Sequence, residues 1–286
     1  MTFRPHASPR LAIAVALLAP AVAFSSRAAL SKQTAFPGQD ANAIVAAAVQ
    51  SELNSDRNDH TAFIYRTHDV TPDHDTLYQV IETPQGNLRR KLEDHGRPLS
   101  PEDRKAEDDR IKRLLNDKGA QARDQKEDAR EDEQAEKMLR LLPAAYIWTI
   151  EGEQGDLVTL NFKPDPQFRP PDMESKVLSA MAGQIVVARG DNRIRTIRGS
   201  LVNDVIFGLR IIGHLKKGGT FDVERREVAP HHWQVTQSNV RIEGHVLFFK
   251  SIGSIDDETS YDFRISTIEN LQQACEVLTV CKPPAK

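Results

Sequence analysis

The strongest constraint on the fold is a series of short runs in which apolar and polar residues alternate. Tight turns connect these runs. The pattern is clearest after Pro143, where residues 144–151 and 157–162 place apolar side chains at every second position. A period of two predicts strands of a sheet with one buried face. Short connections such as residues 189–192 join antiparallel neighbours, because a parallel crossover needs about a dozen residues or more. We therefore expect a mainly β protein.

Further strand-like runs precede and follow these two. They are residues 60–68, 76–83, 87–94, 183–188, 193–203, 219–228, 233–242, 245–255 and 259–265. Helices are expected at residues 40–54, with Asp40 as N-cap, and at residues 172–181, capped by Asp172. The pattern thus predicts about ten strands and few helices.

One segment differs in composition from the rest of the chain. Of the 39 residues from 102 to 140, 24 are charged, 13 of them acidic and 11 basic. Ser100 followed by Pro101 is typical of a helix start, and Gly119 is expected to divide the segment into two helices. Acid-to-base pairs four residues apart favour a solvated helical arm at residues 100–142. The alternative is that this arm docks an envelope protein partner. The apolar residues that could attach it elsewhere are Ile111, Leu114, Leu115, Met138, Leu139 and Leu142.

The N-terminus predicts export from the cytoplasm. Two arginines precede an apolar core at residues 11–24, and the small-residue stretches ending at Ala23 and Ala28 offer cleavage sites. The core is shorter than the roughly 20 apolar residues of a membrane-spanning helix, and Pro20 interrupts it. We therefore interpret residues 1–28 as a cleavable signal peptide rather than an uncleaved anchor. The mature protein is expected in the periplasm or secreted, without a transmembrane segment.

The two cysteines of the chain, Cys275 and Cys281, lie close together near the C-terminus. In an oxidising compartment this spacing favours a short-loop disulfide that pins the tail. A redox or metal-binding pair is the alternative, and it has less support because no second Cys or His pair lies nearby.

Sequence signatures of several function classes are missing. The net charge of −3 gives no electrostatic basis for binding nucleic acid. No G-x-S-x-G elbow, P-loop, G-x-G-x-x-G loop or H-E-x-x-H zinc motif occurs. We therefore name no catalytic residue, expect no cofactor, and do not expect an enzyme. A hydrolase or metal-dependent enzyme remains an alternative that would need a polar site assembled by the fold.

Three polar clusters could form a site, and each has a simpler explanation. Residues 68–69 and 73–75 offer several metal ligands in one hairpin, but polar residues are common at strand ends. His231 and His232 are chain neighbours that point to opposite faces, so we do not expect both to bind one ion. Residues 256–258 are explained as a charged hairpin turn. We accordingly predict no metal site.

Large apolar side chains recur at alternating positions over many strands and predict the lining of an apolar, ligand-binding cavity. A strongly curved sheet with large inward side chains can enclose such a cavity, although a plain packed core explains the same alternation. The predicted lining residues are Trp148, Phe162, Phe207, Ile211, Phe221, Val223, Trp233, Val235, Leu247 and Phe249.

A family resemblance points the same way. Residues 180–187 (AMAGQIVV) and 191–198 (DNRIRTIR) give a helix end, a strand and a turn into the next strand. Residues 207–221 (FGLRIIGHLKKGGTF), Trp233 and residues 246–250 (VLFFK) follow. Together these features resemble the outer-membrane lipoprotein-sorting superfamily, in particular a secreted bacterial branch of it. Members of this superfamily carry lipoproteins or lipids across the periplasm.

The resemblance implies a fold and a ligand. The expected fold is a strongly curved antiparallel sheet, an unclosed β-barrel, with helices on its concave side and acyl chains held in an apolar cavity. The charged helical insertion departs from the compact carriers of this superfamily. Such an arm could cover the barrel mouth or contact another protein.

These features divide the chain into five parts. They are a signal peptide (1–28), the N-terminal helix and first barrel strands (29–99), the charged helical arm (100–142), the remaining barrel strands (143–268) and a C-terminal tail (269–286). We expect a periplasmic lipid-binding or lipoprotein-binding carrier or chaperone that takes up an acyl chain and serves outer-membrane biogenesis. The alternative is a cell-envelope scaffold or interaction protein that uses the charged arm.

Overall fold

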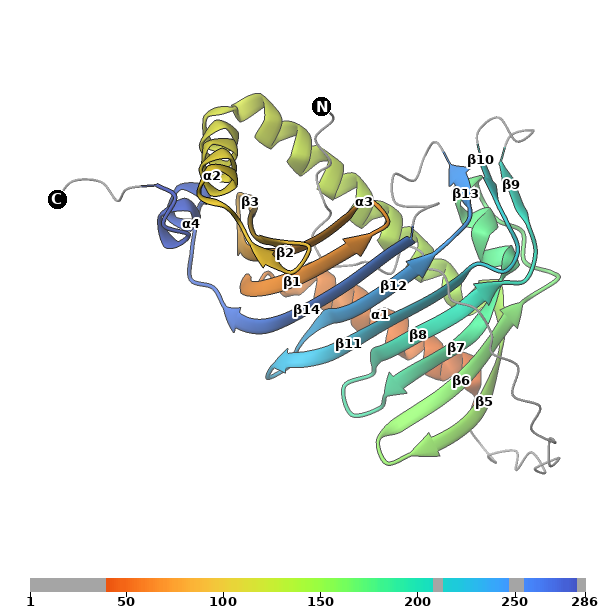
Figure 1. Ribbon diagram of the computed structural model, residues 1–286. Coiled ribbons are helices and arrows are strands. Elements are labelled where there is room, and N and C mark those ends of the chain that lie inside the picture. Colours follow the sequence, from red (N-terminus) through yellow and green to blue (C-terminus); the bar gives the residue numbers. More distant parts are fainter. Residues whose placement is uncertain (1–39, 208–212, 247–254, 282–286) are drawn as a thin grey trace.

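The computed structural model describes residues 40–207, 213–246 and 255–281 (Figure 1). The predicted signal peptide, residues 1–28, lies outside the described residues. The described part is mainly β, as the alternating runs predict, and one large antiparallel sheet dominates it.

Eleven strands form this sheet. They are β1 (Phe63–Thr71), β2 (His74–Thr83), β3 (Gly86–Asp94), β4 (Arg97–Pro98), β5 (Tyr146–Gln154), β6 (Leu157–Pro164), β7 (Met181–Ala188), β8 (Arg193–Leu201), β11 (Thr220–Ala229), β12 (His232–Arg241) and β14 (Ile255–Ile265). Their order is β4-β3-β2-β1-β14-β12-β11-β8-β7-β6-β5. Because β4 and β5 lie at opposite edges, the sheet is not closed into a barrel.

A separate small sheet replaces one predicted hairpin. It contains β9 (Val205–Phe207), β10 (Gly213–Leu215) and β13 (Gly244–Val246), in the order β13-β10-β9. The run at residues 245–255 is therefore not one strand paired with β12, whose neighbours are β11 and β14. Gly244 allows this departure, since its φ of 152° is accessible mainly to glycine and a Cβ there would lie 2.1 Å from the His214 carbonyl oxygen.

The interpretation of residues 256–258 as a turn is also wrong. Asp256, Asp257 and Glu258 lie inside β14, where they pair with Val240, Asn239 and Ser238 of β12. Asp257 and Glu258 also pair with β1 on the other side. Backbone pairing on both sides outweighs the low strand propensity of acidic residues, which is why composition alone misplaced them.

Four α-helices and one 3₁₀-helix accompany the strands of the described chain. They are α1 (Ala41–Asn58), α2 (Pro101–Asn116), α3 (Lys118–Ala145), the 3₁₀-helix η1 (Glu174–Ala180) and α4 (Leu271–Val277). The side chains of Asp40, Ser100 and Asp117 cap the first three by accepting a hydrogen bond from a backbone N–H of the first turn. The break between α2 and α3 is thus at Asp117 and not at Gly119.

Helices α1 and α3 pack on one face of the large sheet, which we call the inner face. Their apolar residues join those of β5, β6, β7, β8, β11 and β12 in the main buried cluster. The two helices are also tied to each other, because Arg57 of α1 forms an ion pair of 2.6 Å with Glu136 of α3. Figure 1 shows α3 running along the sheet from the β3 end toward the β5 end.

The opposite face of β2 and β3 has its own cover. Ile81 and Leu88 on these strands pack with Ile111 of α2 and Leu271 of α4 in a second buried cluster. Cys275 and Cys281 form a disulfide next to this cluster. Helix α2 is therefore anchored on the chain's own sheet through Ile111, which is fully buried.

Candidate functional site

The inner face changes character across the sheet. The strand register aligns one residue from each of eight strands in a single row, because directly paired residues share a face. From β6 to β2 the row is Leu160, Ile185, Ile197, Val223, Ser238, Glu258, Asp69 and Thr76. We call the β5–β11 part the apolar half of the inner face, and the part formed by β12, β14, β1, β2 and β3 the polar half. The polar half also carries apolar residues: Val235 and Val240 of β12 belong to the main buried cluster, and Phe63, Tyr65 and Val80 form a third one.

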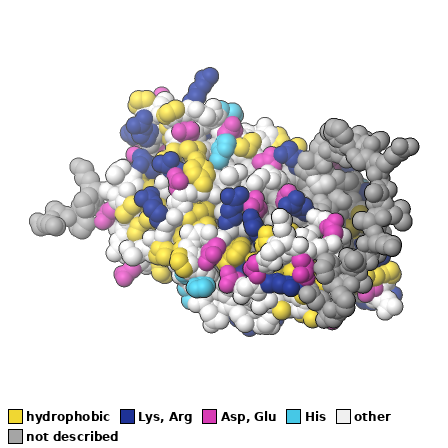
Figure 2. Space-filling model, turned by 90° about the horizontal axis from the view of Figure 1, so that it is seen from below, with side chains coloured by type: hydrophobic (Ala, Val, Ile, Leu, Met, Phe, Trp, Pro, Cys, Tyr) yellow, Lys and Arg dark blue, Asp and Glu magenta, His cyan; other side chains and the backbone are white. Residues whose placement is uncertain are grey.

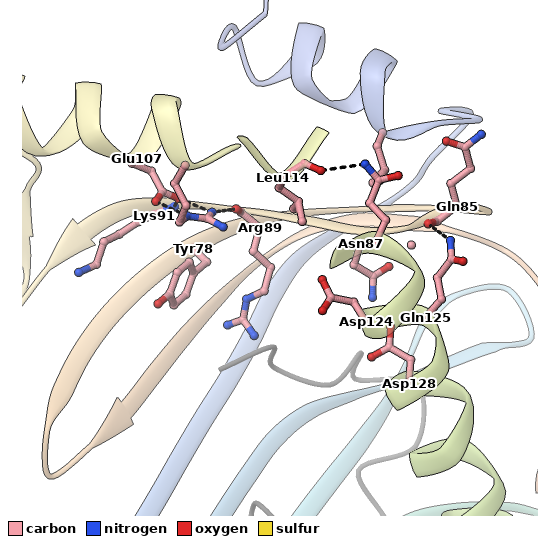
Figure 3. A pocket seen from close by; sticks show the side chains of 14 residues that line it. Tyr78, Gln85, Asn87, Arg89, Lys91, Glu107, Leu114, Asp124, Gln125 and Asp128 are labelled. Carbon is pink, nitrogen blue, oxygen red and sulfur yellow. Dashed lines mark hydrogen bonds and ion pairs between the residues drawn. The ribbon is translucent and has the colours of Figure 1, made fainter. Parts of the chain in front are cut away.

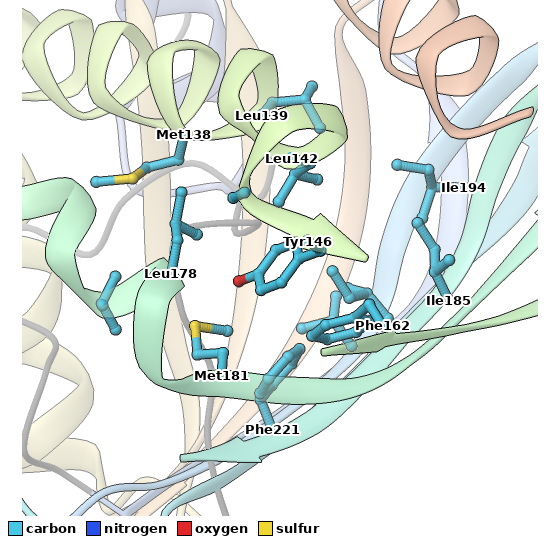
Figure 4. Packing of buried hydrophobic residues seen from close by; sticks show 14 of the residues in the cluster. Met138, Leu139, Leu142, Tyr146, Phe162, Leu178, Met181, Ile185, Ile194 and Phe221 are labelled. Atoms are coloured by element: carbon cyan, nitrogen blue, oxygen red, sulfur yellow. The ribbon is translucent and has the colours of Figure 1, made fainter. Parts of the chain in front are cut away.

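The apolar half encloses a small cavity beneath the C-terminal part of α3. Its volume is about 20 Å³. The lining is entirely hydrophobic or aromatic and consists of Met138, Leu139, Leu142, Tyr146, Trp148, Phe162, Leu178, Met181, Ile197, Phe221 and Val223. Figure 4 shows the side chains of α3 pointing toward Tyr146, Phe162 and Phe221 from above the strands. A space of this size holds about one water molecule, so most of this half is packed core.

The predicted lining residues separate into three groups. The described core cluster contains Trp148, Phe162, Phe207, Phe221, Val223 and Val235. Four of these, Trp148, Phe162, Phe221 and Val223, line the cavity. Trp233 is only partly buried and faces a different, polar pocket. Ile211, Leu247 and Phe249 lie outside the described residues.

The cavity also uses residues that were not predicted to line it. Met138, Leu139 and Leu142 of α3 were expected only to attach the charged arm, and Leu178 and Met181 were not singled out. The helical spacing of Met138, Leu139 and Leu142 shows that these three residues share one face of α3. It does not show which part of the sheet that face contacts. The long-range packing of α3 on β5 and η1 supplies that information.

Carboxylates gather in the polar half. Asp69 is 1% exposed and forms ion pairs with His74 (3.1 Å) and Arg89 (3.7 Å). Burial, together with the nearby charges of Asp69 and Glu258, raises the pKa of Asp256 to about 6. Burial also raises the pKa of Glu258, although Arg89 acts in the opposite direction. The polar half therefore gathers several carboxylates around Arg89 and His74.

A pocket of about 390 Å³ adjoins this set, between β2–β3 and the helices α2 and α3. Its volume lies in the range of small-molecule sites. The guanidinium of Arg89 lies 4.4 Å from the centre of the Tyr78 ring, and Figure 3 shows Asp124 and Asp128 of α3 close to it. Gln125 of α3 donates a hydrogen bond of 2.7 Å to the Gln85 carbonyl oxygen in the β2–β3 turn.

The α3 side of this pocket is rich in negative charge. Burial, followed by repulsion from Glu131, Asp132, Asp124 and Glu127, raises the pKa of Asp128 to about 6. At neutral pH the first half of α3 therefore brings negative charge to this pocket, and its Gln125 hydrogen bond to the β2–β3 turn attaches it to the sheet. Its second half rests on apolar packing.

A buried ionic group connects α1 with the sheet between these regions. Glu52 of α1 is 1% exposed and pairs with Arg193 (2.9 Å) and Arg225 (2.5 Å). The Ile194 backbone N–H also donates to the Glu52 carboxylate at 2.7 Å. Burial alone would raise the pKa of Glu52, but the two guanidinium groups lower it. A polar pocket of about 210 Å³ that includes Trp233 lies beside this group.

The two histidine-containing clusters noted in the sequence, at residues 68–75 and 231–232, form pairwise contacts in the structure. His68 pairs with Asp75 (2.6 Å) and His74 with Asp69 (3.1 Å), but among the described residues this hairpin does not bring three metal ligands together. His232 pairs with Asp59 at 2.7 Å, whereas the preceding His231 is exposed in the β11–β12 turn. On the face shown in Figure 2, basic and acidic side chains are interspersed rather than gathered in a basic stripe.

Two further observations bear on function. Among the described residues, no helix is long and apolar enough to cross a membrane. Comparison of the chain with protein-family models, with curated proteins and with solved structures finds no match.

Proposed function

We propose that this protein is a non-enzymatic carrier of an acyl-chain ligand, a lipid or the acyl chain of a lipoprotein, in the periplasm or outside the cell. The observation that carries the proposal is the inner face of the open sheet. Its apolar half surrounds a cavity with an apolar lining, and residues near the C-terminus of α3 cover that cavity together with Leu178 of η1. Aromatic rings and the flexible Met138 and Met181 side chains suit a site that repacks around an apolar chain.

The cavity must enlarge to admit such a chain. Its volume of about 20 Å³ has room for about one water molecule, far less than an acyl chain needs. In our proposal, α3 moves away from β5, β6 and β11, and the ligand replaces its apolar side chains. The described structure, with its small cavity, is then the closed state.

The contacts of α3 support such a movement. Lys137 holds the helix to the η1 segment through ion pairs with Asp172 (2.7 Å) and Glu174 (3.0 Å). These side chains are partly exposed, so the pairs contribute at most about 1 kcal/mol. At the other end of α3, the repulsion around Asp128 weakens docking on the polar half. Buried apolar residues near the C-terminus of α3, together with the Arg57–Glu136 pair to α1, provide most of its attachment.

The energetics are sufficient for binding. Burying about ten methylene groups at about 0.8 kcal/mol each contributes about 8 kcal/mol, which corresponds to a micromolar dissociation constant. The cost of displacing α3 must be subtracted from this value. A longer chain, or a head group that contacts the polar half, would offset that cost.

The alternative of a docking arm has less support. Ile111 of α2 and Met138, Leu139 and Leu142 of α3 are buried against the chain's own sheet and helices. The apolar residues that would attach a partner are therefore already occupied in the described structure.

The experiment compares uptake of a fluorescent fatty acid by the mature chain and by two variants. Lys137→Ala removes the ion pairs from α3 to η1, and Lys105→Ala removes an exposed pair with Asp109 inside α2. We expect the first variant to bind about two- to fivefold faster, since a loss of up to about 1 kcal/mol shifts the opening equilibrium by that factor.

Lys105→Ala is the matched control and should bind at the wild-type rate. Failure of all three proteins to bind the probe would overturn the proposed function. Equal rates in the presence of binding would overturn the role of α3 as the moving cover.

A further inference from the structure

Two hairpin turns lie next to each other at one end of the large sheet. Residues 189–192 connect β7 to β8, and residues 230–231 connect β11 to β12. Because β8 and β11 are antiparallel neighbours, the beginning of β8 lies beside the end of β11. The topology therefore places one turn against the other, although about forty residues separate them in the chain.

The two turns bring together three side chains that bind metals. Asp191 comes from the first turn, while Glu227 and His231 come from the end of β11 and the second turn. One ligand atom from each lies within 4.8 Å of the other two, and all three residues are exposed. We propose that Asp191, Glu227 and His231 form a site for a divalent transition-metal ion of the zinc class.

Contacts around the site hold the turns in place before any ion binds. The His231 backbone N–H donates a hydrogen bond of 2.7 Å to Glu227 Oε1. His231 has a φ of 65°, which ends the strand abruptly. A β-bulge lies between Glu227 and Ala229, and bulges redirect side chains at strand ends. On the other turn, the Ser51 hydroxyl of α1 donates to the Asp191 carbonyl oxygen at 3.1 Å.

The chemistry of the donors selects the class of ion. One imidazole nitrogen with two carboxylates is a mixed donor set that suits zinc and its neighbours better than calcium or magnesium, which prefer oxygen ligands alone. Zinc ligands at about 2.0–2.2 Å from the ion lie roughly 3.3 Å apart in a tetrahedron. Exposed side chains can close from 4.8 Å to that spacing by small rotations. Three protein ligands leave the fourth position for water.

The site would join the two hairpins on which the second half of α1 rests. Ser51 contacts the first turn, and Glu52 pairs with Arg193 at the beginning of β8. A bound ion would therefore stabilise the end of the sheet that anchors α1. This inference is independent of the acyl-chain proposal, because the site lies outside the cavity and uses none of its residues.

The experiment titrates the chelator-treated mature chain with Zn²⁺, using calorimetry for stoichiometry and thermal unfolding for stabilisation. His231→Asn removes the imidazole and keeps a residue type that tolerates a positive φ. His95→Asn is the matched control, since His95 is also exposed, has a φ of 50°, and lies 2.9 Å from a single carboxylate, Asp94.

We expect one Zn²⁺ per wild-type chain and an unfolding temperature that rises with Zn²⁺ concentration. His231→Asn and Asp191→Asn should each weaken binding by more than the roughly 10- to 100-fold typical of losing an outer-shell partner. His95→Asn should leave the affinity unchanged. Substoichiometric uptake by the wild type, or equal affinities of His231→Asn and His95→Asn, would overturn the proposal.

Discussion

The two halves of the inner face belong to one sheet and one strand register, yet they are held together by different forces. In the apolar half, the row from Leu160 to Val223 packs against α1 and α3 with almost no free volume. In the polar half, Asp69 and Glu258 occupy the equivalent positions of the same row. Packing depends little on pH, whereas buried acids respond to it strongly. The comparison teaches that apolar packing holds α3 at its C-terminal end, whereas polar contacts that depend on pH hold it at its N-terminal end.

The largest expected effect comes from the ionic group that anchors α1. Glu52→Gln leaves Arg193 and Arg225 buried without a negative partner. We expect the free energy of unfolding to fall by about 3–5 kcal/mol, measured by urea denaturation. Gln50→Ala, on the exposed side of the same helix, is the control and should change stability by less than about 1 kcal/mol. Similar losses in both variants would contradict the anchoring role.

The second prediction compares the two halves directly, within one row of residues. Leu160→Ala removes a fully buried side chain from the apolar half and should cost about 2–5 kcal/mol. Thr76→Val, at the polar end of the row, replaces a buried hydroxyl by a methyl group of similar size, so its effect should stay below about 1.5 kcal/mol. Denaturant midpoints measure both. Equal losses would remove the distinction between the halves.

The third prediction concerns the sign of the pH dependence in the polar half. The pKa of Asp256 is raised from 3.8 to about 6, so the folded state binds its proton more tightly than the unfolded state. The resulting stability is fully present below about pH 4 and is lost as the pH rises through 6. Asp256→Asn cannot ionise and should be more stable than the wild type at pH 8, by about 1 kcal/mol after solvent screening.

The corresponding measurement is thermal unfolding of both proteins between pH 3.5 and pH 8. The two curves should converge at the acidic end. A constant difference at all pH values would show that packing of the side chain, and not its charge, causes the effect.

The smallest effect is expected at Asp128 on α3. Its pKa, also raised to about 6, has the same sign of pH dependence, but it is more exposed and its cost is more strongly screened. Asp128→Asn should stabilise the protein by less than about 1 kcal/mol at pH 8 and should slow fatty-acid uptake, because α3 then docks more firmly. Faster uptake by this variant would contradict the claim that the charge of Asp128 weakens the docking of α3.

The sequence predicts the local pattern well and the long-range pairing poorly. Alternation and short turns locate β6, β7, β8, β11 and β12, since these signals lie within a few residues of each other. They do not show that β1 and β14 are neighbours across almost the whole chain. Residues 256–258 were misplaced for this reason, because only the strands on either side explain acidic residues within a strand.

The same limit applies to the candidate sites. Trp148, Phe162, Phe221 and Val223 were predicted to line a cavity, as alternation places them on one face. The helix that covers them, α3, looked like a solvated arm because its composition is dominated by charge. Tertiary contacts between distant segments form the ionic group around Glu52 and the cluster of Asp191, Glu227 and His231. No local sequence pattern predicts either of them.

The most direct test of the central claim is native mass spectrometry of the mature protein, purified without detergent and then titrated with a fatty acid. The account predicts one acyl chain bound per protein, together with increased hydrogen exchange in α3, residues 118–145, as the helix leaves the apolar half. A mass that stays ligand-free at all fatty-acid concentrations would contradict the carrier function. Bound ligand with unchanged exchange in α3 would contradict the proposed route of entry.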